Sequence, residues 1–151
     1  MPSPPPLAFT LEGLRAYLAE IFPQIWRSGG HEIEAIGSMS ARVRLRRHDD
    51  HLRPGGTISG PAMFALADVA LYVAVLAQIG RVPLAVTTNL TINFLRKPAP
   101  GDLIGEARLM KLGKRLAVGE VSLRSPGAAA MVAHATGTYS IPARRGEEAV
   151  L

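Results

Sequence analysis

The sequence contains no cysteine among its 151 residues, which excludes disulfide bridges and thiolate metal sites and fits a cytoplasmic protein. Aromatic residues are also few, with four Phe, three Tyr and one Trp. A chain so poor in aromatic side chains lacks the stacking platform of a nucleic-acid-binding surface, so we do not expect nucleic acid as a partner. The net charge of +5 therefore indicates, at most, attraction to a smaller anion such as a phosphorylated ligand.

Charged residues are limited to 19% of the chain, whereas apolar residues make up 48%, a composition typical of one globular domain of this length. We expect residues 1–9, which are rich in proline, and residues 143–151 to be flexible tails. The domain is then residues 10–142. The first residues have no basic region ahead of an apolar one, so they do not resemble a secretory signal.

The longest apolar run, residues 61–79, carries one carboxylate, Asp68, near its middle. Its length is just sufficient for a membrane span, but an acidic residue at mid-span costs roughly 2.5–3.5 kcal/mol. We therefore predict a buried helix and no membrane association. Gly60 and Pro61 mark the start of this helix, and Gly80 marks its end.

The rest of the sequence predicts a short helix followed by strands. Leu11, Leu14, Leu18 and Ile21 recur at helical spacing before Pro23, with Thr10 as the cap. Alternating apolar and polar residues predict about five strands. These strands lie within residues 39–46, 85–98, 102–112, 115–125 and 130–141. Tight turns at residues 113–114 and 125–127 imply an antiparallel sheet, so the fold class is α+β, a sheet wrapped around one long helix.

A carboxylate in an apolar helix has a cost that a purely structural helix does not need. Phe64 and Tyr72, four residues on either side of Asp68, are expected to shield it from bulk water, which makes a carboxylate more basic. The free backbone N–H of Gly60, at the start of the helix, is suited to an oxyanion. Asp68 lies two turns further along, too far from Gly60 to share one carbonyl group within a chain.

Three segments together are similar to a known family. They are Gly56-Thr57-Ile58-Ser59-Gly60, then Leu66-Ala67-Asp68, then Thr87 with residues 93–101. Their order and spacing resemble the PaaI-like acyl-CoA thioesterases, from about residue 31 to about residue 141. The resemblance implies a hotdog fold, hydrolysis of an acyl- or aryl-CoA thioester, and no cofactor beyond the coenzyme A of the substrate. It also implies a site shared between subunits, and hence a homodimer or a homotetramer.

The chain departs from the family pattern at two side chains, because Arg53 stands where the family has Asn and Ser59 where it has His. Pro61 replaces the second glycine of the family motif, while Gly56, Gly60 and Asp68 are retained. A Thr or Ser is common at the position of Thr87. By this resemblance and the chemistry above, the catalytic candidates are Asp68 as general base or nucleophile, Gly60, Ser59 and Thr87.

Substrate-binding candidates combine cations and the neighbours of the carboxylate. Exposed cations near the mouth of an acyl site suit the phosphates of coenzyme A. The candidates are Arg53, Gly56, Phe64, Tyr72, Arg96, Lys97, Lys114 and Arg115. The loop His48-Asp49-Asp50-His51 has the residue types of a metal site, but adjacent ligands without further spacing are more typical of a solvated turn, and we predict no metal.

Two other functions that occur on this fold are also consistent with the sequence. The first is a protein that binds acyl-CoA without hydrolysing it, which the loss of the family His and Asn favours. The second is a hydratase or dehydratase, which pairs a His with an acid and is disfavoured by Ser59. Fold alone does not decide between them.

Overall fold

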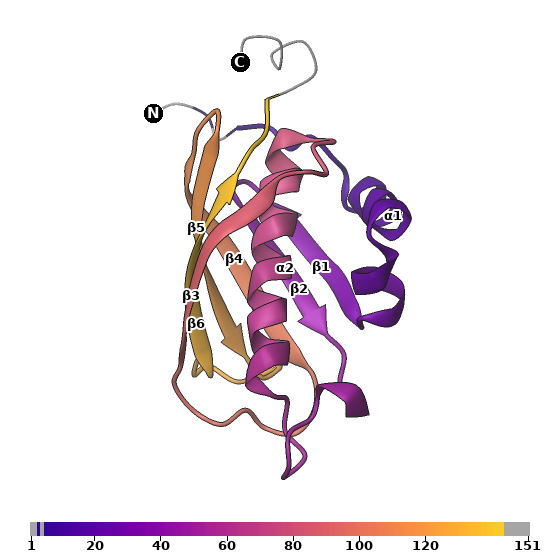
Figure 1. Ribbon diagram of the computed structural model, residues 1–151, viewed down its shortest axis with the longest axis vertical. Helices are drawn as coiled ribbons and strands as arrows, with labels where there is room; N and C mark the ends of the chain where they lie inside the picture. Colours follow the sequence, from indigo (N-terminus) through magenta and orange to yellow (C-terminus); the bar gives the residue numbers. More distant parts are fainter. Residues whose placement is uncertain (1–2, 4, 144–151) are drawn as a thin grey trace.

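One antiparallel sheet wraps around one long helix (Figure 1). The structure, a computed structural model, describes residue 3 and residues 5–143. The helical elements are α1 (Leu11–Ile21), a π-helical turn (Gln24–Ser28), a 3-10 turn (Asp49–His51) and α2 (Gly60–Ile79). The strands are β1 (His31–Gly37), β2 (Ser40–Leu45), β3 (Val86–Phe94), β4 (Leu103–Leu112), β5 (Leu116–Arg124) and β6 (Ala133–Ser140).

The sheet has six strands in the order β1-β2-β4-β5-β6-β3, and all neighbours are antiparallel. This is the hotdog fold that the sequence predicted. The predicted number of about five strands was low by one, because β1 was missed. β1 and β2 form a hairpin whose turn includes Met39 in a left-handed conformation, φ 59°, which is uncommon for a residue other than glycine.

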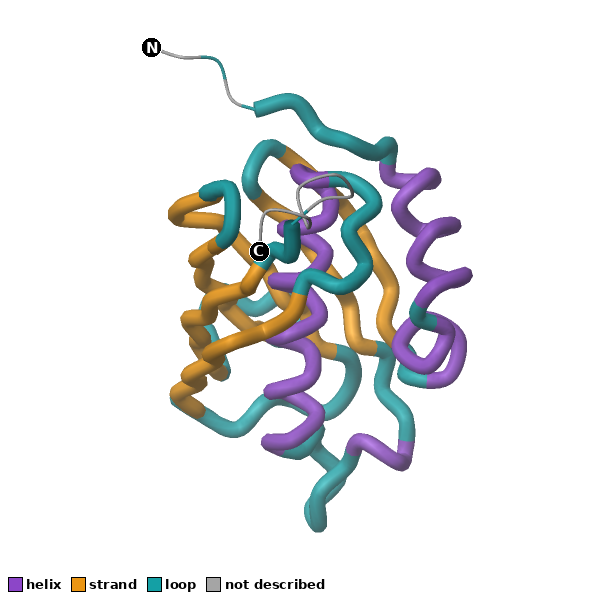
Figure 2. Tube along the Cα trace, turned by 45° about the horizontal axis from the view of Figure 1, so that its top comes forward, coloured by secondary structure: helices purple, strands orange, loops and turns teal. Residues whose placement is uncertain are grey.

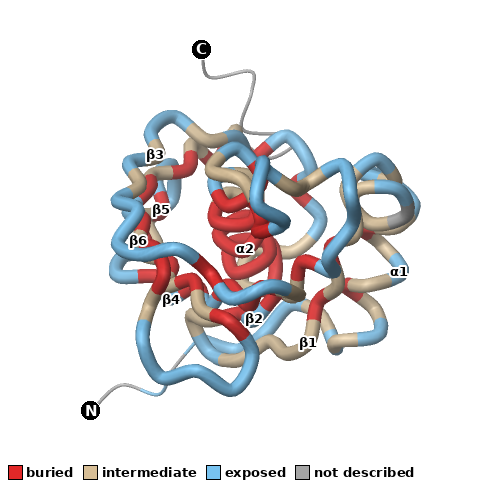
Figure 3. Tube along the Cα trace, turned by 90° about the horizontal axis from the view of Figure 1, so that it is seen from below, coloured by how far each residue is buried: buried red, intermediate tan, exposed pale blue. Residues whose placement is uncertain are grey.

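Helix α2 is the core of the domain, as its composition predicted, and 13 of its residues are buried (Figure 3). The helix is long and apolar enough to cross a membrane by length and composition, but it is packed inside the sheet. Ser59 caps its start by accepting a hydrogen bond from the backbone N–H of Ala62 at 3.3 Å. Gly80 ends it with a positive φ of 89°. Both predicted boundaries are confirmed.

Two glycines at the centre of the sheet allow α2 to lie close against it. Gly119 on β5 faces Gly137 on β6 in the register of these strands. A Cβ atom on Gly119 would lie 2.6 Å from one methyl group of Leu71, and one on Gly137 would lie 2.9 Å from the other. Any larger residue here would push the helix away from the sheet, so these glycines fix the depth at which α2 lies.

The N-terminal elements pack beside the sheet over β1 (Figure 2). Thr10 caps α1 as predicted, and Leu14 and Leu18 are fully buried. The predicted loose segment, residues 1–9, lies partly outside the described residues. Its described part contacts the C-terminal end of α2, where the backbone N–H of Ala8 donates to the carbonyl of Ala77 at 2.7 Å. Residues 144–151, the predicted C-terminal tail, lie outside the described residues.

Candidate active site

The lone carboxylate of α2, Asp68, is half-buried at the middle of the helix. Two hydroxyl groups donate hydrogen bonds to its Oδ1 atom at 2.6 Å, one from Thr87 on β3 and one from Tyr139 on β6. The Tyr139 hydroxyl also lies 3.0 Å from the backbone carbonyl oxygen of Asp68. Neutral donors therefore satisfy this carboxylate, and no basic side chain in the described part of the chain forms an ion pair with it.

These hydrogen bonds distinguish the two oxygens of the Asp68 carboxylate. Both hydroxyl groups donate to Oδ1, whereas Oδ2 accepts no hydrogen bond from the side chains that the structure describes, which exclude that of Arg27. Hydrogen bonds of this length to a carboxylate are charge-assisted and stronger than neutral ones, so they fix the orientation of the side chain. The arrangement leaves Oδ2 as the oxygen available to a bound molecule.

Tyr139 is a residue of this candidate site that was not predicted from the sequence. Burial, the charge of Asp68 and the hydrogen bond to it raise the pKa of Tyr139 far above its ordinary value. The phenol therefore stays protonated and acts as a permanent donor. One signal was present in the sequence: in the strand of residues 133–140, Tyr139 shares the inward face with Ala133, Ala135 and Gly137, and a buried tyrosine hydroxyl needs a partner.

Asp68 lines a cavity of about 610 Å³ between α2, the α1 end and the loop before β3. Thr87 and Tyr139 line the same cavity, together with Tyr72 of α2. Burial raises the pKa of Tyr72 to about 12, and its hydroxyl donates to the carbonyl oxygen of Pro83 at 3.0 Å. The structure thus brings together three of the predicted residues, Asp68, Tyr72 and Thr87, around one largely apolar space.

Phe64 does not take the position that helical spacing predicted for it. Its side chain is 41% exposed, and it does not line the cavity of Asp68. Residues at i−4 and i+4 lie on the same helix face, but of Phe64 and Tyr72 only Tyr72 lines the cavity with Asp68. Ala65 and Val69 line the cavity beside Asp68, so within one chain Phe64 does not shield the carboxylate.

The start of α2 lines a second cavity, of about 450 Å³, whose wall includes Arg53, Gly60, Arg96 and Lys97. The N–H of Gly60 has no acceptor among the described residues. A Cβ atom on Gly60 would lie 3.5 Å from the ring of Phe94, so glycine leaves this wall open. The hydroxyl of Ser59 is engaged as the helix cap, which is the structural role that a Ser at this position commonly has.

Gly56 shapes the loop that leads into α2. It has a φ of +85°, which favours glycine, and its N–H donates to the carbonyl of Arg53 at 3.0 Å. The side chain of Arg53 is exposed on this turn. Gly60 and Asp68 line different cavities, and they are separated by about 12 Å along the helix. As predicted from their spacing, the two do not form one site within a single chain.

The predicted cations lie at opposite ends of the sheet. Arg96 and Lys97 follow the C-terminal end of β3, where Phe94 pairs with Ala133. Lys114 and Arg115 form the turn between β4 and β5, beside the other end of β6, where Leu116 pairs with Ser140. One chain therefore does not gather all four around one ligand.

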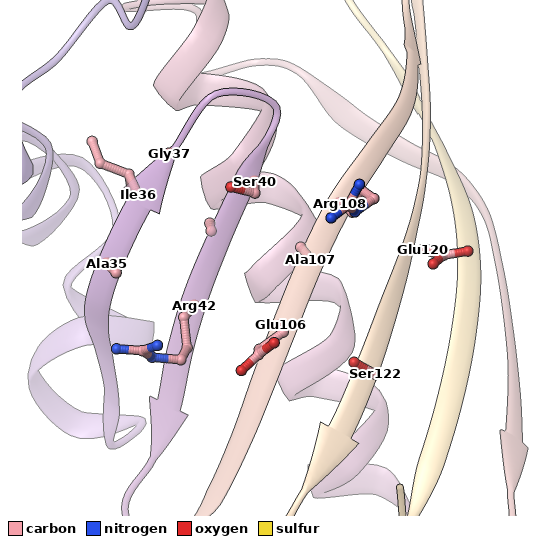
Figure 4. A pocket seen from close by; sticks show the side chains of 11 residues that line it. Ala35, Ile36, Gly37, Ser40, Arg42, Glu106, Ala107, Arg108, Glu120 and Ser122 are labelled. Atoms are coloured by element: carbon pink, nitrogen blue, oxygen red, sulfur yellow. The ribbon is translucent and has the colours of Figure 1, made fainter. Parts of the chain in front are cut away.

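A third hollow, of about 350 Å³, lies on the outer face of the sheet, away from α2 (Figure 4). Arg42, Glu106, Arg108 and Glu120 surround it, and none of them is a predicted site residue. Arg42 forms an ion pair with Glu34 at 3.2 Å. Within the described residues, no group of three or more His, Cys, Asp or Glu is placed to hold a metal ion.

Comparison with known proteins identifies the family. A family model described as "Thioesterase superfamily" matches residues 55–131, about half of the chain. A protein of Saccharolobus solfataricus that is named as an esterase is 30% identical over 118 residues, which cover 78% of this chain and 77% of that protein.

Solved structures agree with this family. The crystal structure of a protein described as a thioesterase, from Silicibacter sp. TM1040, is 54% identical, with a TM-score of 0.85 over 93% of this chain and 97% of that one. A structure of the phenylacetic acid degradation protein PaaI from Thermus thermophilus is 27% identical, with a TM-score of 0.68, and covers 80% and 99% of the two chains.

Fold, family model and structural neighbours together define a hotdog thioesterase. The chain belongs to the thioesterase superfamily, and its neighbours support the PaaI-like branch that the motifs predicted.

Proposed function

We propose that the protein is an acyl-CoA thioesterase in which Asp68 acts as general base or nucleophile. The observation that carries this proposal is the geometry of the carboxylate: two hydroxyl groups hold Oδ1, and Oδ2 has no partner among the described residues in a largely apolar cavity of about 610 Å³. A carboxylate oriented in this way is suited to act on a thioester carbonyl carbon.

As general base, Oδ2 of Asp68 takes a proton from a water molecule while the water oxygen attacks the carbonyl carbon. The carbonyl oxygen then carries negative charge, which a backbone N–H such as that of Gly60 stabilises. The carbon–sulfur bond breaks next, and the departing thiolate takes a proton to give coenzyme A and the free acid. As nucleophile, Oδ2 attacks the carbon directly, the carbon–sulfur bond breaks and coenzyme A leaves as the thiolate, which takes a proton. Water then hydrolyses the mixed anhydride, which returns the Asp68 carboxylate and releases the free acid. Tyr139 and Thr87 serve both routes by holding the carboxylate.

The edge strand β3 supports a site built from two copies of the chain. Within the described residues β3 pairs with β6 alone, and it carries exposed apolar side chains at both ends, with Val86 57% and Phe94 52% exposed. An unpaired apolar edge favours pairing with a second copy. Antiparallel pairing of β3 with its copy around a two-fold axis near Leu90 brings the Thr87 end of one strand beside the Phe94 end of the other.

This pairing would join the two half-sites. Asp68 contacts Thr87 at one end of β3, and Gly60 adjoins Phe94 at the other end. In the dimer, Asp68 of one subunit therefore approaches Gly60 of the partner. The same two-fold rotation brings Arg96 and Lys97 of one subunit to the end of the partner's sheet that carries the β4–β5 turn. The predicted cation sets, separated in one chain, then lie at the same end of the assembly and are suited to the phosphates of coenzyme A.

A protein that binds acyl-CoA without turnover is the second candidate, because Arg53 and Ser59 replace the two polar residues of the family motif and the Ser59 hydroxyl is engaged as a cap. A hydratase is less well supported, since no His of the described chain lines the cavity of Asp68.

Release of free thiol from a panel of acyl-CoA substrates tests the proposal, with light scattering on the same sample. We expect hydrolysis by a dimer or tetramer. A monomer at micromolar concentration would contradict the two-subunit site, and tight binding without thiol release would favour the second candidate.

A further inference from the structure

The outer wall of the Asp68 cavity comes from the N-terminal segment of the chain. Ile21, Phe22, Gln24 and Ile25 line this wall, opposite the residues of α2. The segment lies outside residues 55–131, the part that matches the family model. The carboxylate thus sits on the common framework of the family, whereas this wall is added by a segment that the family model does not include.

The wall is connected to the carboxylate by a row of aromatic rings. Phe22 packs edge-on against Tyr72, with ring centres 6.3 Å apart. Tyr72 stacks on Tyr139 at 6.0 Å, and Tyr139 donates to Asp68. Although it belongs to this row, Phe22 remains 37% exposed. A molecule whose reacting carbon lies at Asp68 would therefore extend along the rings and meet Phe22.

The backbone of the segment holds Phe22 in a defined position. The Phe22 N–H donates to the carbonyl of Leu18 at 2.8 Å and ends α1, and Pro23 prevents the helix from continuing. The chain then forms the π-helical turn Gln24–Ser28, a rare geometry that occurs frequently at functional sites. Two residues of the wall, Gln24 and Ile25, belong to this turn.

The charge of the lining restricts the molecule that it can accept. Among the side chains that the structure describes, which do not include that of Arg27, Asp68 is the only carboxylate that lines the cavity, and no Lys, Arg or His lines it. A carboxylate at the far end of an acyl group would lose its hydration without gaining an ion pair. Gln24 supplies one neutral amide, and the remaining wall residues are apolar.

We propose that residues 21–25 are the acyl-selecting wall of the enzyme and that Phe22 sets the size of the acyl group. The acyl group is neutral and largely apolar, with its far end against the Phe22 ring. This inference rests on the proposed function, because it requires that the cavity of Asp68 takes the acyl part of a thioester.

The activity test uses Phe22→Ala, with Phe22→Leu as a milder variant and Met110→Ala as a control. Met110 is 53% exposed and lies outside the cavity, so its truncation removes similar apolar bulk elsewhere. We expect the ratio of kcat/KM for decanoyl-CoA over hexanoyl-CoA to rise about tenfold in Phe22→Ala, less in Phe22→Leu, and not in Met110→Ala. Succinyl-CoA should be a poor substrate for every form. Equal ratios in all variants, or efficient cleavage of succinyl-CoA, would overturn the inference.

A binding test separates this inference from the proposed hydrolysis. Trp26 is the only Trp, and it lies in the same turn as Gln24 and Ile25, so its fluorescence reports on the wall. Non-hydrolysable thioether analogues of hexanoyl- and decanoyl-CoA are titrated into the wild type and Phe22→Ala. A fluorescence change with a length preference that shifts in the variant supports the wall even if thiol release is absent. Thiol release with no fluorescence change and no shift in length preference would support the proposed thioesterase activity but contradict the role of residues 21–25 as the acyl-selecting wall.

Discussion

Acid should destabilise the protein through one buried histidine, His31 at the start of β1. Its side chain is only 7% exposed, and neither ring nitrogen has a hydrogen-bond partner among the described residues. The ring packs against Trp26 at 6.3 Å. Burial, together with the nearby His51, lowers the pKa of His31 from 6.5 to about 4, although the carbonyl of Ile25 opposes this shift.

The direction of the effect follows from this lowered pKa. Between pH 6.5 and 4 the unfolded chain binds a proton at His31 more readily than the folded protein does, so the free energy of unfolding falls as the pH falls. The contribution of the neutral His31 to the free energy of unfolding is complete above pH 6.5 and is lost at about pH 4. One pKa unit corresponds to about 1.4 kcal/mol, so the loss is about 3 kcal/mol. The pKa of Asp102 is lowered chiefly by the hydrogen bond from the Arg47 N–H. The contribution of Asp102 to the free energy of unfolding is therefore lost only below pH 3.8, the ordinary pKa of an Asp.

Urea unfolding at pH 7, 6, 5 and 4.5, followed by Trp fluorescence at one protein concentration, measures this loss. His31→Phe keeps a ring against Trp26 but cannot be protonated, so its stability should depend much less on pH in this window. His48→Gln is the matched control, because the His48 side chain is 63% exposed. The reasoning is refuted if the wild type and His31→Phe lose the same free energy of unfolding between pH 7 and pH 4.5.

Two further predictions concern the site. Tyr139→Phe removes one donor to the carboxylate, so stability should fall by about 1.5–3 kcal/mol in urea unfolding. The kcat should also fall with little change in KM, since Oδ1 of Asp68 is held less firmly; an unchanged kcat would assign Tyr139 a purely structural role. Replacing Lys114 and Arg115 by Ala should raise KM for an acyl-CoA more than for the matching acyl-pantetheine, and equal increases would show that these residues do not contact the nucleotide phosphates.

The central helix and most of the sheet could be predicted because local signals mark them. Gly60-Pro61 and Gly80 bound α2, and alternation identifies the strands after it. β1 was missed because the left-handed residue of its turn into β2 is Met39, two residues after Gly37, the glycine at this turn. The hairpin as a whole fixes the left-handed conformation of Met39, and methionine has no preference for this conformation from which the turn could be predicted.

The candidate site could be predicted only in part, because sequence spacing fixes a helix face but not what covers it. Asp68 was identified because burying a carboxylate in an apolar helix costs free energy, and Thr87 was identified by resemblance to the family pattern. Tyr139 follows Asp68 by 71 residues, and only the pairing of β6 with β3 brings its hydroxyl to the carboxylate. Phe22 was not singled out from the sequence, since its contact with Tyr72 depends on how α1 packs beside the sheet.

The most direct test of the proposed mechanism is thiol release by Asp68→Asn beside the wild type, on the best acyl-CoA of the panel. An amide keeps the shape and can still accept hydrogen bonds from Thr87 and Tyr139, but it takes no proton and is a poor nucleophile. We expect kcat to fall by about 10²–10⁴, while the mass stays that of the wild type and the melting temperature falls only slightly, because the amide oxygen keeps both hydrogen bonds in their weaker, neutral form. A stable Asn variant with full activity would remove Asp68 from the mechanism. A variant that dissociates or unfolds would instead identify Asp68 as a structural residue.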